Sequence, residues 1–576
     1  MNKMKHYLLH SCRRAALAAL FVLLAVSVAS CGSDHAKILP ADCPGVVKID
    51  VKSLLEKSQL DERSEVKDWK EKALDYADEH FSSSTHKRLK EMFDDPAEFG
   101  VDLREAVYVY APSKSFKYSG FVAKVLDEDK LYDFLDMMRD ENKDMGKLKE
   151  YDNCRMLVAD NGRAALAFDS DVLIFAASVE GEGRTARDLS RRFDEMGDES
   201  ILDNPAFAEM DARDGDVTAY LSYADLLKVM PEYMTKELKQ MTKGTGIDGF
   251  ALMAGLNFGD ETVEAWMEPC ALTDEARTQM EKYAGMQREV SGKYLAKLPK
   301  ETFLVAGFGV EGAKWWNEVA KQSVVKEALQ KEPEMAKMFG DIFKAVEGEG
   351  VFAMGLPESD DAHEPLMTAF VDLKSNAAVE KLLSQMAGGN VSTDVSDSVA
   401  YGDTEVYADS VVAEPDYYGY GYYDYDPYVS EPAFSKDPAT GRYRYCFNTY
   451  HSADTPARYA VLGTTKSLFY FSNQSGFDPK ASASPSIAGA DYAERIKGKV
   501  AYGVIDFRTL FGNSEVRKEI DRSPFADYAD HLSTLEMYAD KDMKCSMVLY
   551  LKDLGKNDTP LSLLVDMIAD LADKNL

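Results

Sequence analysis

The sequence predicts an α+β protein made of two tandem copies of one unit, each a mixed, mainly antiparallel sheet with amphipathic helices packed on one face. Two observations predict this fold. Segments in which apolar and polar residues alternate, the pattern of a half-buried strand, lead into segments with apolar residues at helical spacing. These patterns recur in the same order about 250 to 300 residues later, which indicates an internal duplication. The length of 576 residues also exceeds that of one typical domain.

The chain begins with a segment typical of a bacterial lipoprotein signal. Basic residues precede an uncharged apolar run over residues 15–29, and residues 28–31 have the sequence VASC. We therefore predict a signal peptide over 1–30, lipid attachment through Cys31 and a lipidated tether over 31–37. Two or more acyl chains hold a protein stably on a bilayer. No other uninterrupted apolar stretch approaches the ~20 residues of a membrane span.

The first unit is expected over residues 38–285. Val47, Ile49 and Val51 alternate with charged residues, which predicts a half-buried strand. Asp127 is placed to cap a helix after a later strand. In order, the predicted elements are a strand at 46–52 that enters a helix at 53–55, a strand at 121–126 followed by an amphipathic helix, a hairpin at 165–175 and a strand at 216–221.

The second unit is expected over residues 290–576. Its matching elements are a strand at 302–308 followed by a helix, a strand at 369–373 followed by an amphipathic helix, a hairpin at 459–471 and a strand at 499–504. The hairpin is displaced further than the other elements. This displacement predicts an insertion over 413–457 in the second unit.

The predicted insertion is rich in tyrosine. Residues 414–428 combine tyrosine with Gly, Pro and Asp, a composition that predicts a loop. Tyrosine rings contact sugars or peptides in antibody loops, so this loop is a candidate ligand surface. The alternative is a low-complexity segment without a ligand. The candidate ligand contacts are Tyr417, Tyr418, Tyr420, Tyr422, Tyr423 and Tyr425.

Composition narrows the classes of partner and cofactor. The formal net charge of −32 argues against nucleic-acid binding, which requires clustered basic residues, and against lying along an anionic bilayer. Five cysteines follow Cys31 without a CxxC motif or close pair, so neither a disulfide framework nor a zinc site is predicted. We expect no metal and no cofactor.

Catalytic motifs are weak or missing. Residues 307–312 fit G-x-G-x-x-G between a strand and a helix, but the first unit makes the matching turn without glycine, so no dinucleotide site is expected. Residues 211–216 have the sequence DARDGD, which lacks the register and distal Glu of a calcium loop and predicts a plain turn. The sequence contains no nucleophile elbow, P-loop or zinc-protease helix. We therefore predict no enzymatic activity.

Three traits together resemble a known family. They are the lipobox at 28–31, the tether that ends in ILPAD at 38–42, and the strand at 46–50 running into the helix at 53–55. The chain resembles the large lipoproteins of Bacteroidota grouped as domain of unknown function 4836. The resemblance implies a cell-envelope lipoprotein and brings no catalytic residues with it.

These observations favour a non-enzymatic, lipid-anchored binding or assembly protein of a Gram-negative outer membrane. Its partners would be the membrane, through the N-terminal lipid, and an envelope protein or a glycan. Gly32 after the cysteine favours the outer membrane, on either its periplasmic or its outer side. One alternative is a glycan-capturing surface lipoprotein acting with an outer-membrane transporter. Another is an envelope hydrolase with an active site between the two copies.

Overall fold

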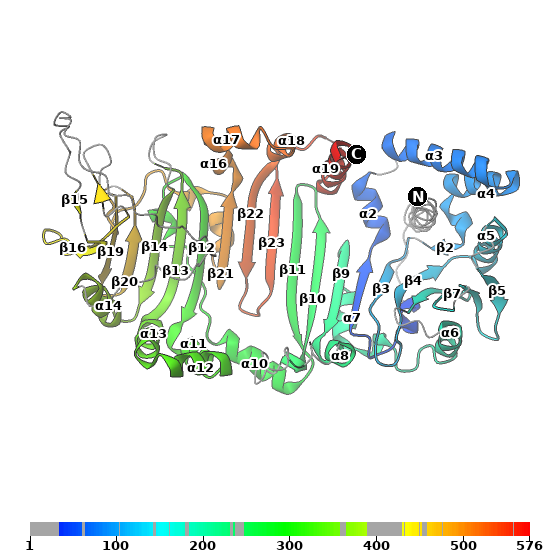
Figure 1. Cartoon of the computed structure of the whole chain (residues 1–576), viewed down its shortest axis with the longest axis horizontal. Helices are drawn as coiled ribbons and strands as arrows, with labels where there is room; N and C mark the ends of the chain where they lie inside the picture. Colours follow the sequence, from blue (N-terminus) through cyan, green and yellow to red (C-terminus); the bar gives the residue numbers. More distant parts are fainter. Residues whose placement is uncertain are drawn as a thin grey trace, which may run out of the picture. The chain divides into compact units, whose positions relative to one another are not determined.

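A computed structural model shows an α+β protein (Figure 1). It describes residues 34–575, with gaps at 60–63, 103, 142–145, 160–161, 179–183, 231–233, 235, 237–246, 358–364, 389–428, 431, 448–449, 452–457, 475 and 557. The chain forms two compact units. Unit 1 combines the N-terminal part up to Gly285 with the C-terminal segment Val504–Leu576, and unit 2 is Met286–Gly503.

Unit 1 contains one continuous run of antiparallel strands. The strands at the two ends of this run come from distant parts of the sequence. In spatial order the strands are β22 (Leu532–Ala539), β23 (Cys545–Leu551), β11 (Thr262–Ala271), β10 (Phe250–Phe258), β9 (Val217–Ser222), β1 (Gly45–Ile49), β3 (Val107–Tyr110), β4 (Ser119–Val125), β8 (Val172–Ala177), β7 (Ala164–Phe168), β6 (Arg155–Val158) and β5 (Lys147–Glu150). The short β2 (Val101–Asp102) also pairs with β4. The C-terminal hairpin β22–β23 thus extends a sheet that the N-terminal part begins.

The helices of unit 1 lie between these strands in the sequence. They are η1 (Asp34–Ile38), α2 (Val51–Ser58), α3 (Ser64–His80), α4 (Ser83–Asp94), η3 (Pro96–Phe99), α5 (Glu128–Glu141), α6 (Thr185–Asp194), η5 (Ile201–Asp203), α7 (Pro205–Asp211), α8 (Tyr223–Val229), η6 (Ile247–Gly249), α10 (Asp274–Ala284), α16 (Phe507–Phe511), α17 (Ser514–Ile520), α18 (Ala526–Ala529) and α19 (Pro560–Asn575). Several begin at side chains that cap free backbone N–H groups. Asp50 accepts from the amide of Ser53 at the start of α2, and Asn204 caps α7 just before Pro205.

Unit 2 contains a second run of antiparallel strands. In spatial order they are β21 (Ala501–Asp506, which continues into unit 1), β12 (Thr302–Glu311), β13 (Val346–Gly355), β14 (Leu366–Leu373), β20 (Leu468–Ser472), β19 (Tyr459–Thr465), β17 (Tyr443–Cys446) and β16 (Phe434–Lys436). β15 (Val429–Ser430) and β18 (Tyr450–His451) form a separate pair. The helices are η7 (Leu295–Lys297), α11 (Gly312–Val319), α12 (Ser323–Lys331), α13 (Pro333–Ala345), α14 (Ala377–Ala387), η8 (Ile487–Gly489) and α15 (Tyr492–Ile496).

The core of unit 1 lies on both faces of its sheet around β4 and β8. Val122 of β4 belongs to a cluster that includes side chains of η1, α6 and α7. The next residue, Ala123, belongs to a second cluster with side chains of α4 and α5. Successive residues of a strand point to opposite faces, so helices cover both faces here. The expectation of helices on one face only is wrong for this part of the sheet.

The predicted α+β class and the mainly antiparallel pairing are confirmed, and the described strands other than β15 and β18 belong to one large antiparallel sheet. The two units do not follow two consecutive stretches of sequence, because residues 504–576 belong to unit 1. In the predicted insertion over 413–457, the described residues include β16 and β17, which pair with the sheet through β19.

Candidate functional site: an apolar face of the sheet

The predicted site residues lie outside the described part of the chain. Cys31, the predicted lipid attachment, precedes the first described residue. The six candidate tyrosines, Tyr417, Tyr418, Tyr420, Tyr422, Tyr423 and Tyr425, fall in the gap at 389–428. The structure therefore tests neither the lipid attachment at Cys31 nor the ligand contacts of the six tyrosines.

The glycine motif at 307–312 lies mostly on strand β12 rather than in a loop. A Cβ at Gly307 would lie 2.4 Å from the Tyr502 ring, and one at Gly309 would lie 2.0 Å from the carbonyl oxygen of Arg288. These glycines let neighbouring groups approach the strand closely. Gly307 and Gly309 therefore have a packing role in unit 2.

The acidic segment at 211–216 serves structural contacts. Asp211 accepts a hydrogen bond of 2.6 Å from the hydroxyl of Tyr108 and lies 3.2 Å from the ammonium of Lys48. Among the described residues, no group of three or more His, Cys, Asp or Glu side chains is arranged to hold a metal ion.

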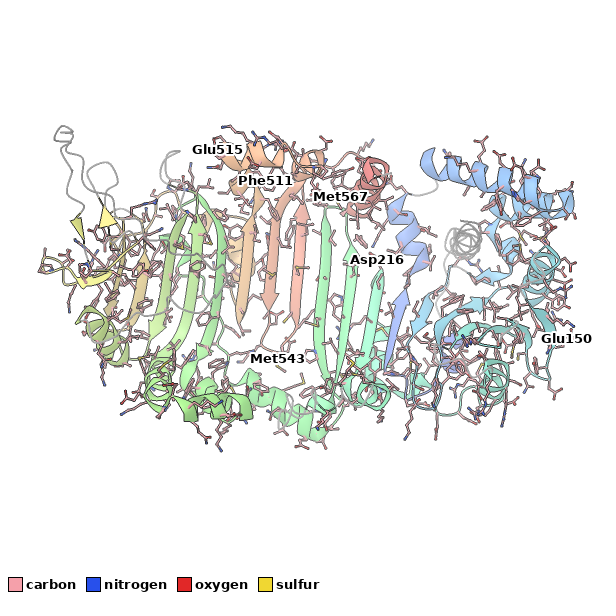
Figure 2. The ribbon with its side chains drawn as sticks, viewed as in Figure 1. Glu150, Asp216, Phe511, Glu515, Met543 and Met567 are labelled. Atoms are coloured by element: carbon pink, nitrogen blue, oxygen red, sulfur yellow. The ribbon has the colours of Figure 1, made fainter. Side chains whose placement is uncertain are left out.

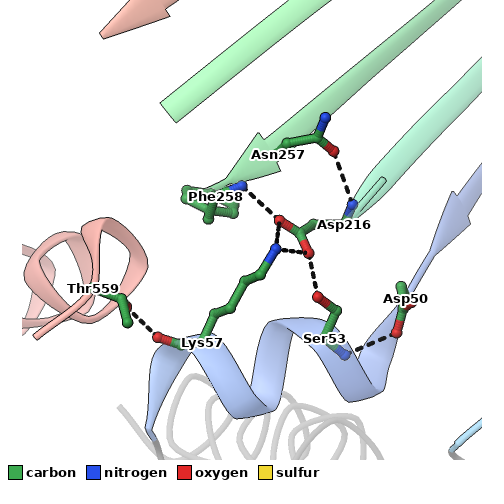
Figure 3. A network of polar contacts seen from close by, with 7 residues as sticks. All are labelled: Asp50, Ser53, Lys57, Asp216, Asn257, Phe258 and Thr559. Carbon is green, nitrogen blue, oxygen red and sulfur yellow. Dashed lines mark hydrogen bonds and ion pairs between the residues drawn. The ribbon is translucent and has the colours of Figure 1, made fainter. Parts of the chain in front are cut away.

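Asp216 is the centre of a buried polar network that joins α2 to the sheet (Figure 3). Its carboxylate accepts hydrogen bonds from the Ser53 hydroxyl at 2.5 Å, from the Lys57 ammonium at 2.7 and 2.8 Å, and from the Phe258 amide at 2.6 Å. The Thr559 hydroxyl, just before α19, donates to the backbone carbonyl of Lys57. The network connects α2 and the C-terminal segment to the residue that precedes β9. The donors around Asp216 supply hydrogen bonds to both oxygens of its buried carboxylate.

The most unusual surface of unit 1 is one face of the sheet from β3 to β22. The strand register places two rows of side chains side by side on this face. One row is Val109, Val47, Ala219, Ala254, Met267, Cys545 and Ala539. The next row is Val107, Ile49, Val217, Leu256, Ala265, Met547 and Met537. We call these two rows, with the flanking Leu221 and Leu252, the apolar face; none of its side chains is charged.

Several side chains of the apolar face are exposed to solvent. The exposed fraction is 45% for Met267, 45% for Met547, 42% for Met537 and 42% for Val109. In Figure 1 the helices α16, α17, α18 and α10 lie near the ends of β11, β22 and β23, whereas α7 packs on β9 and β10 on the side of Tyr220 and Met253. In Figure 2 Met543 marks one end of these strands, at the hairpin between β22 and β23, and Asp216 marks the other, before β9. Contiguous exposed apolar patches of this kind commonly mark binding sites.

The side opposite the apolar face is buried, and on β22 it is polar. On β22, Glu536 is fully buried and accepts hydrogen bonds from the hydroxyls of Thr534 and Tyr538, whereas Met537 between them is exposed. On β11, Trp266 is buried and the guanidinium carbon of Arg213 lies 4.8 Å from the centre of its ring. On β22 the usual rule that the apolar side of a strand faces the core is therefore reversed, whereas on β1, β3, β9 and β10 the buried side carries core residues such as Val46, Tyr108, Tyr220 and Met253.

The apolar face was not predicted from the sequence. The alternation on β11 and β22 predicts a half-buried strand but does not say which side is buried. The types of side chain do indicate which side is buried. Trp266, Thr534 and Tyr538 lie on the side opposite the methionines. Large amphipathic rings with a hydrogen-bonding group suit a packed interior with polar partners.

Unit 2 also exposes apolar side chains on its sheet. Phe308 of β12 and Phe352 of β13 are 43% and 39% exposed. The ring of Phe308 lies against Gly350, where a Cβ would be 2.4 Å from the ring. Further along the same sheet, Val371 and Phe469 pack with α14. Both units thus combine a covered and an exposed part of the sheet.

A comparison with protein families identifies the chain. The family described as Domain of unknown function (DUF4836) matches residues 35–408. The chain belongs to this family. No curated protein and no solved structure matches it. In the described part of the chain, no helix has both the length and the apolar character needed to span a membrane.

Proposed function

We propose that this member of the DUF4836 family is a non-enzymatic binding or assembly module of the cell envelope, anchored by lipid at Cys31. The observation that supports the binding role is the charge-free, exposed apolar face of unit 1. A sheet face without charged or hydroxyl groups offers contact area to a ligand, and its one thiol, Cys545, has Met267 and Ala539 as its cross-strand neighbours on the face rather than an acid or base.

The binding role is tested with a neutral apolar fluorescent probe. The full chain should bind N-phenyl-1-naphthylamine saturably, and the double variant Met267→Lys/Met547→Lys should lose this binding because two ammonium groups would stand in the apolar face. Met335→Lys is the matched control, since Met335 is 48% exposed but lies on α13 in unit 2. Equal binding by the double variant and the wild type would contradict the proposal.

The anchor is tested at two cysteines of the N-terminal segment. Cells expressing the full chain should incorporate labelled palmitate, and the protein should enter the membrane fraction. Cys31→Ser should abolish both results, whereas Cys12→Ser should leave them unchanged, because Cys12 lies within the predicted signal. Labelling that survives Cys31→Ser would rule out this attachment point. Fractionation of outer and inner membranes, followed by protease treatment of intact cells, tests the proposed outer-membrane location and its side.

Glycan capture beside an outer-membrane transporter remains a second proposal, motivated by the six tyrosines between 417 and 425. Replacing these tyrosines by serine should abolish binding on a glycan array if they contact the sugar. Retained glycan binding would exclude them as the contacts.

We also propose that the sequence stretches 38–285 and 290–576 derive from one duplicated stretch. The order β12, β13, β14, β20, β19, β17 in unit 2 parallels the order β1, β3, β4, β8, β7, β6 in unit 1. A helix follows the third strand in each order, α14 after β14 and α5 after β4. The same pairings at matched positions support descent of both orders from a common ancestor.

A further inference from the structure

We propose that the lipid at Cys31 holds unit 1 directly against the headgroup layer of a bilayer, with the surface around η1 facing the lipid. This inference rests on the proposed lipid attachment and adds which surface of unit 1 the anchor turns toward the membrane. It is carried by the packing of η1 into unit 1 and by the short stretch of chain between η1 and Cys31. We call η1, together with the adjoining residues 104–106 and 124–127, the anchor corner.

The chain enters the folded body immediately after Asp34. Asp34 is exposed, whereas His35 is 2% exposed and Ala36, Ile38 and Leu39 are fully buried. The three apolar side chains belong to the same core cluster as the inner sides of β3, β4 and β9. The match to the family also begins at residue 35. η1 is therefore part of the core of unit 1, although the predicted tether overlaps it.

Hydrogen bonds fix the backbone of the same segment. Nε of Arg192, on α6, donates to the carbonyl oxygen of Ile38 at 2.5 Å. The amide of Ile201, on η5, donates to the carbonyl oxygen of Leu39 at 2.9 Å. Release of the segment would expose its apolar side chains and leave buried donors without acceptors. η1 therefore gives the anchored chain a fixed end point on unit 1.

The covalent distance from this end point to the anchor is short. Asp34 is three residues after Cys31, and three residues span at most about 11 Å. Cys31 itself must lie in the polar layer of the bilayer if its acyl chains occupy the hydrocarbon core. An α-helix with its side chains is about 10–12 Å wide, so a folded segment does not fit between Asp34 and the headgroups. The anchor corner is therefore the part of unit 1 that the lipid brings to the bilayer.

The charges in and around the anchor corner are mixed. Several form ion pairs, which are Glu105–Lys124, Asp211–Lys48 and Asp102–Arg104, with N···O distances of 3.6, 3.2 and 2.6 Å. η1 adds the acid Asp34 and the cation Lys37. The end of β4 and the adjoining hairpin between β7 and β8 add the acids Asp127, Asp169 and Asp171. Acids thus slightly outnumber cations, so the anchor rather than charge attraction brings this corner to the bilayer. The contact should form on zwitterionic vesicles as well as on anionic ones.

The proposal is tested by photolabelling of the lipidated full chain in vesicles. Phosphatidylcholine vesicles contain a small fraction of phosphatidylethanolamine that carries a diazirine on its headgroup, and mass spectrometry identifies the labelled peptides. Peptides of the anchor corner should carry more label than residues 540–544, in the hairpin between β22 and β23. That hairpin lies six strands from β3, which is about 29 Å along the sheet. Vesicles with added phosphatidylglycerol should give the same pattern.

A linker variant is the matched control. A twenty-residue Gly/Ser linker inserted between Ser33 and Asp34 leaves Cys31 and unit 1 unchanged. Labelling of the anchor corner should fall by roughly threefold or more, because such a linker holds its ends ~25 Å apart on average. Circular dichroism and palmitate incorporation check that the variant is folded and lipidated. If it is not lipidated, the same linker placed six residues later than Cys31 is replaced by a ten-residue linker between Ser33 and Asp34, with a smaller expected loss of label.

The outcomes separate this proposal from the proposed anchor. If palmitate is incorporated at Cys31 but the anchor corner is labelled no more strongly than residues 540–544, the anchor stands and the orientation of unit 1 is refuted. Equal labelling of the corner with and without the linker would also overturn the proposal, since the short chain would not set the contact. Absence of palmitate at Cys31 would refute the anchor and this inference together.

Discussion

Asp216 accepts hydrogen bonds from Ser53, Lys57 and Phe258 in a buried setting, and its removal should be costly. Asp216→Ala leaves the amide of Phe258 and the hydroxyl of Ser53 without their acceptor in a buried setting. We expect a loss of about 2–3 kcal/mol in the free energy of unfolding, measured by urea denaturation. Asp260→Ala, at an exposed hairpin, is the control and should change it by less than ~0.5 kcal/mol. Equal effects of the two substitutions would contradict the structural role of Asp216.

His35 should make the stability of the fold depend on pH. Burial lowers the pKa of its imidazole below 6.5, although Nε2 lies 2.8 Å from the carbonyl oxygen of Ala106. Between the lowered folded-state pKa and 6.5, the unfolded chain binds more protons than the folded chain. The stability due to neutral His35 is therefore present above 6.5 and is lost as pH falls through this range.

The matching measurement compares thermal unfolding of the wild type, His35→Gln and His80→Gln from neutral to mildly acidic pH. His80 is exposed, so His80→Gln should keep the pH slope of the wild type. The stability of His35→Gln should depend less steeply on pH, because the buried imidazole with the lowered pKa is gone. An unchanged slope in His35→Gln would show that His35 does not contribute.

At the scale of elements, the reversed orientation of β22 gives a direct test with two adjacent residues. Tyr538→Ala should destabilise the protein by about 3–5 kcal/mol, because it removes a buried ring and a donor to buried Glu536. Met537→Ala should cost less than about 1 kcal/mol, because Met537 is 42% exposed. Chemical denaturation of the two variants measures the difference. The opposite order of effects would mean that the two faces of this strand are assigned the wrong way round.

At the scale of the whole molecule, the C-terminal segment completes unit 1. Residues 504–576 supply β22 and β23, and β23 pairs with β11 along its length. A chain that stops after Asp506 keeps β21 whole and should leave β11 as an unpaired edge, which favours aggregation. Amide hydrogen exchange should show faster exchange over residues 262–271 in the truncated chain, while 346–355 in unit 2 should keep its protection. Unchanged exchange over 262–271 would contradict the discontinuous unit.

Much of the local structure could be predicted from the sequence because it depends on local patterns. The strand at 46–52 was predicted from alternation and corresponds to β1 (Gly45–Ile49), with α2 beginning at Val51. Asp127 precedes α5 and accepts from the amide of Lys130, as its predicted capping role requires. Alternation and capping involve residues only a few positions apart, so no distant contact has to be known.

The candidate site could not be predicted in the same way. Met267 and Met547 are 280 positions apart in the sequence and lie on neighbouring strands only because β11 pairs with β23. Which side of each strand is buried depends on the helices that cover it, and these come from other parts of the chain. Long-range pairing therefore decides whether an alternating segment contributes to the core or to a surface.

The sequence by itself determined the α+β class, the strongly acidic character, the resemblance to the family and the recurring strand-helix pattern. Only the tertiary structure decided that the strands share one antiparallel sheet, that the C-terminal hairpin joins unit 1, and that the methionine side of β11 and β22 is exposed. The physical reason is that composition and periodicity are properties of neighbouring residues. Strand pairing and burial, in contrast, depend on contacts between segments that are far apart in the sequence.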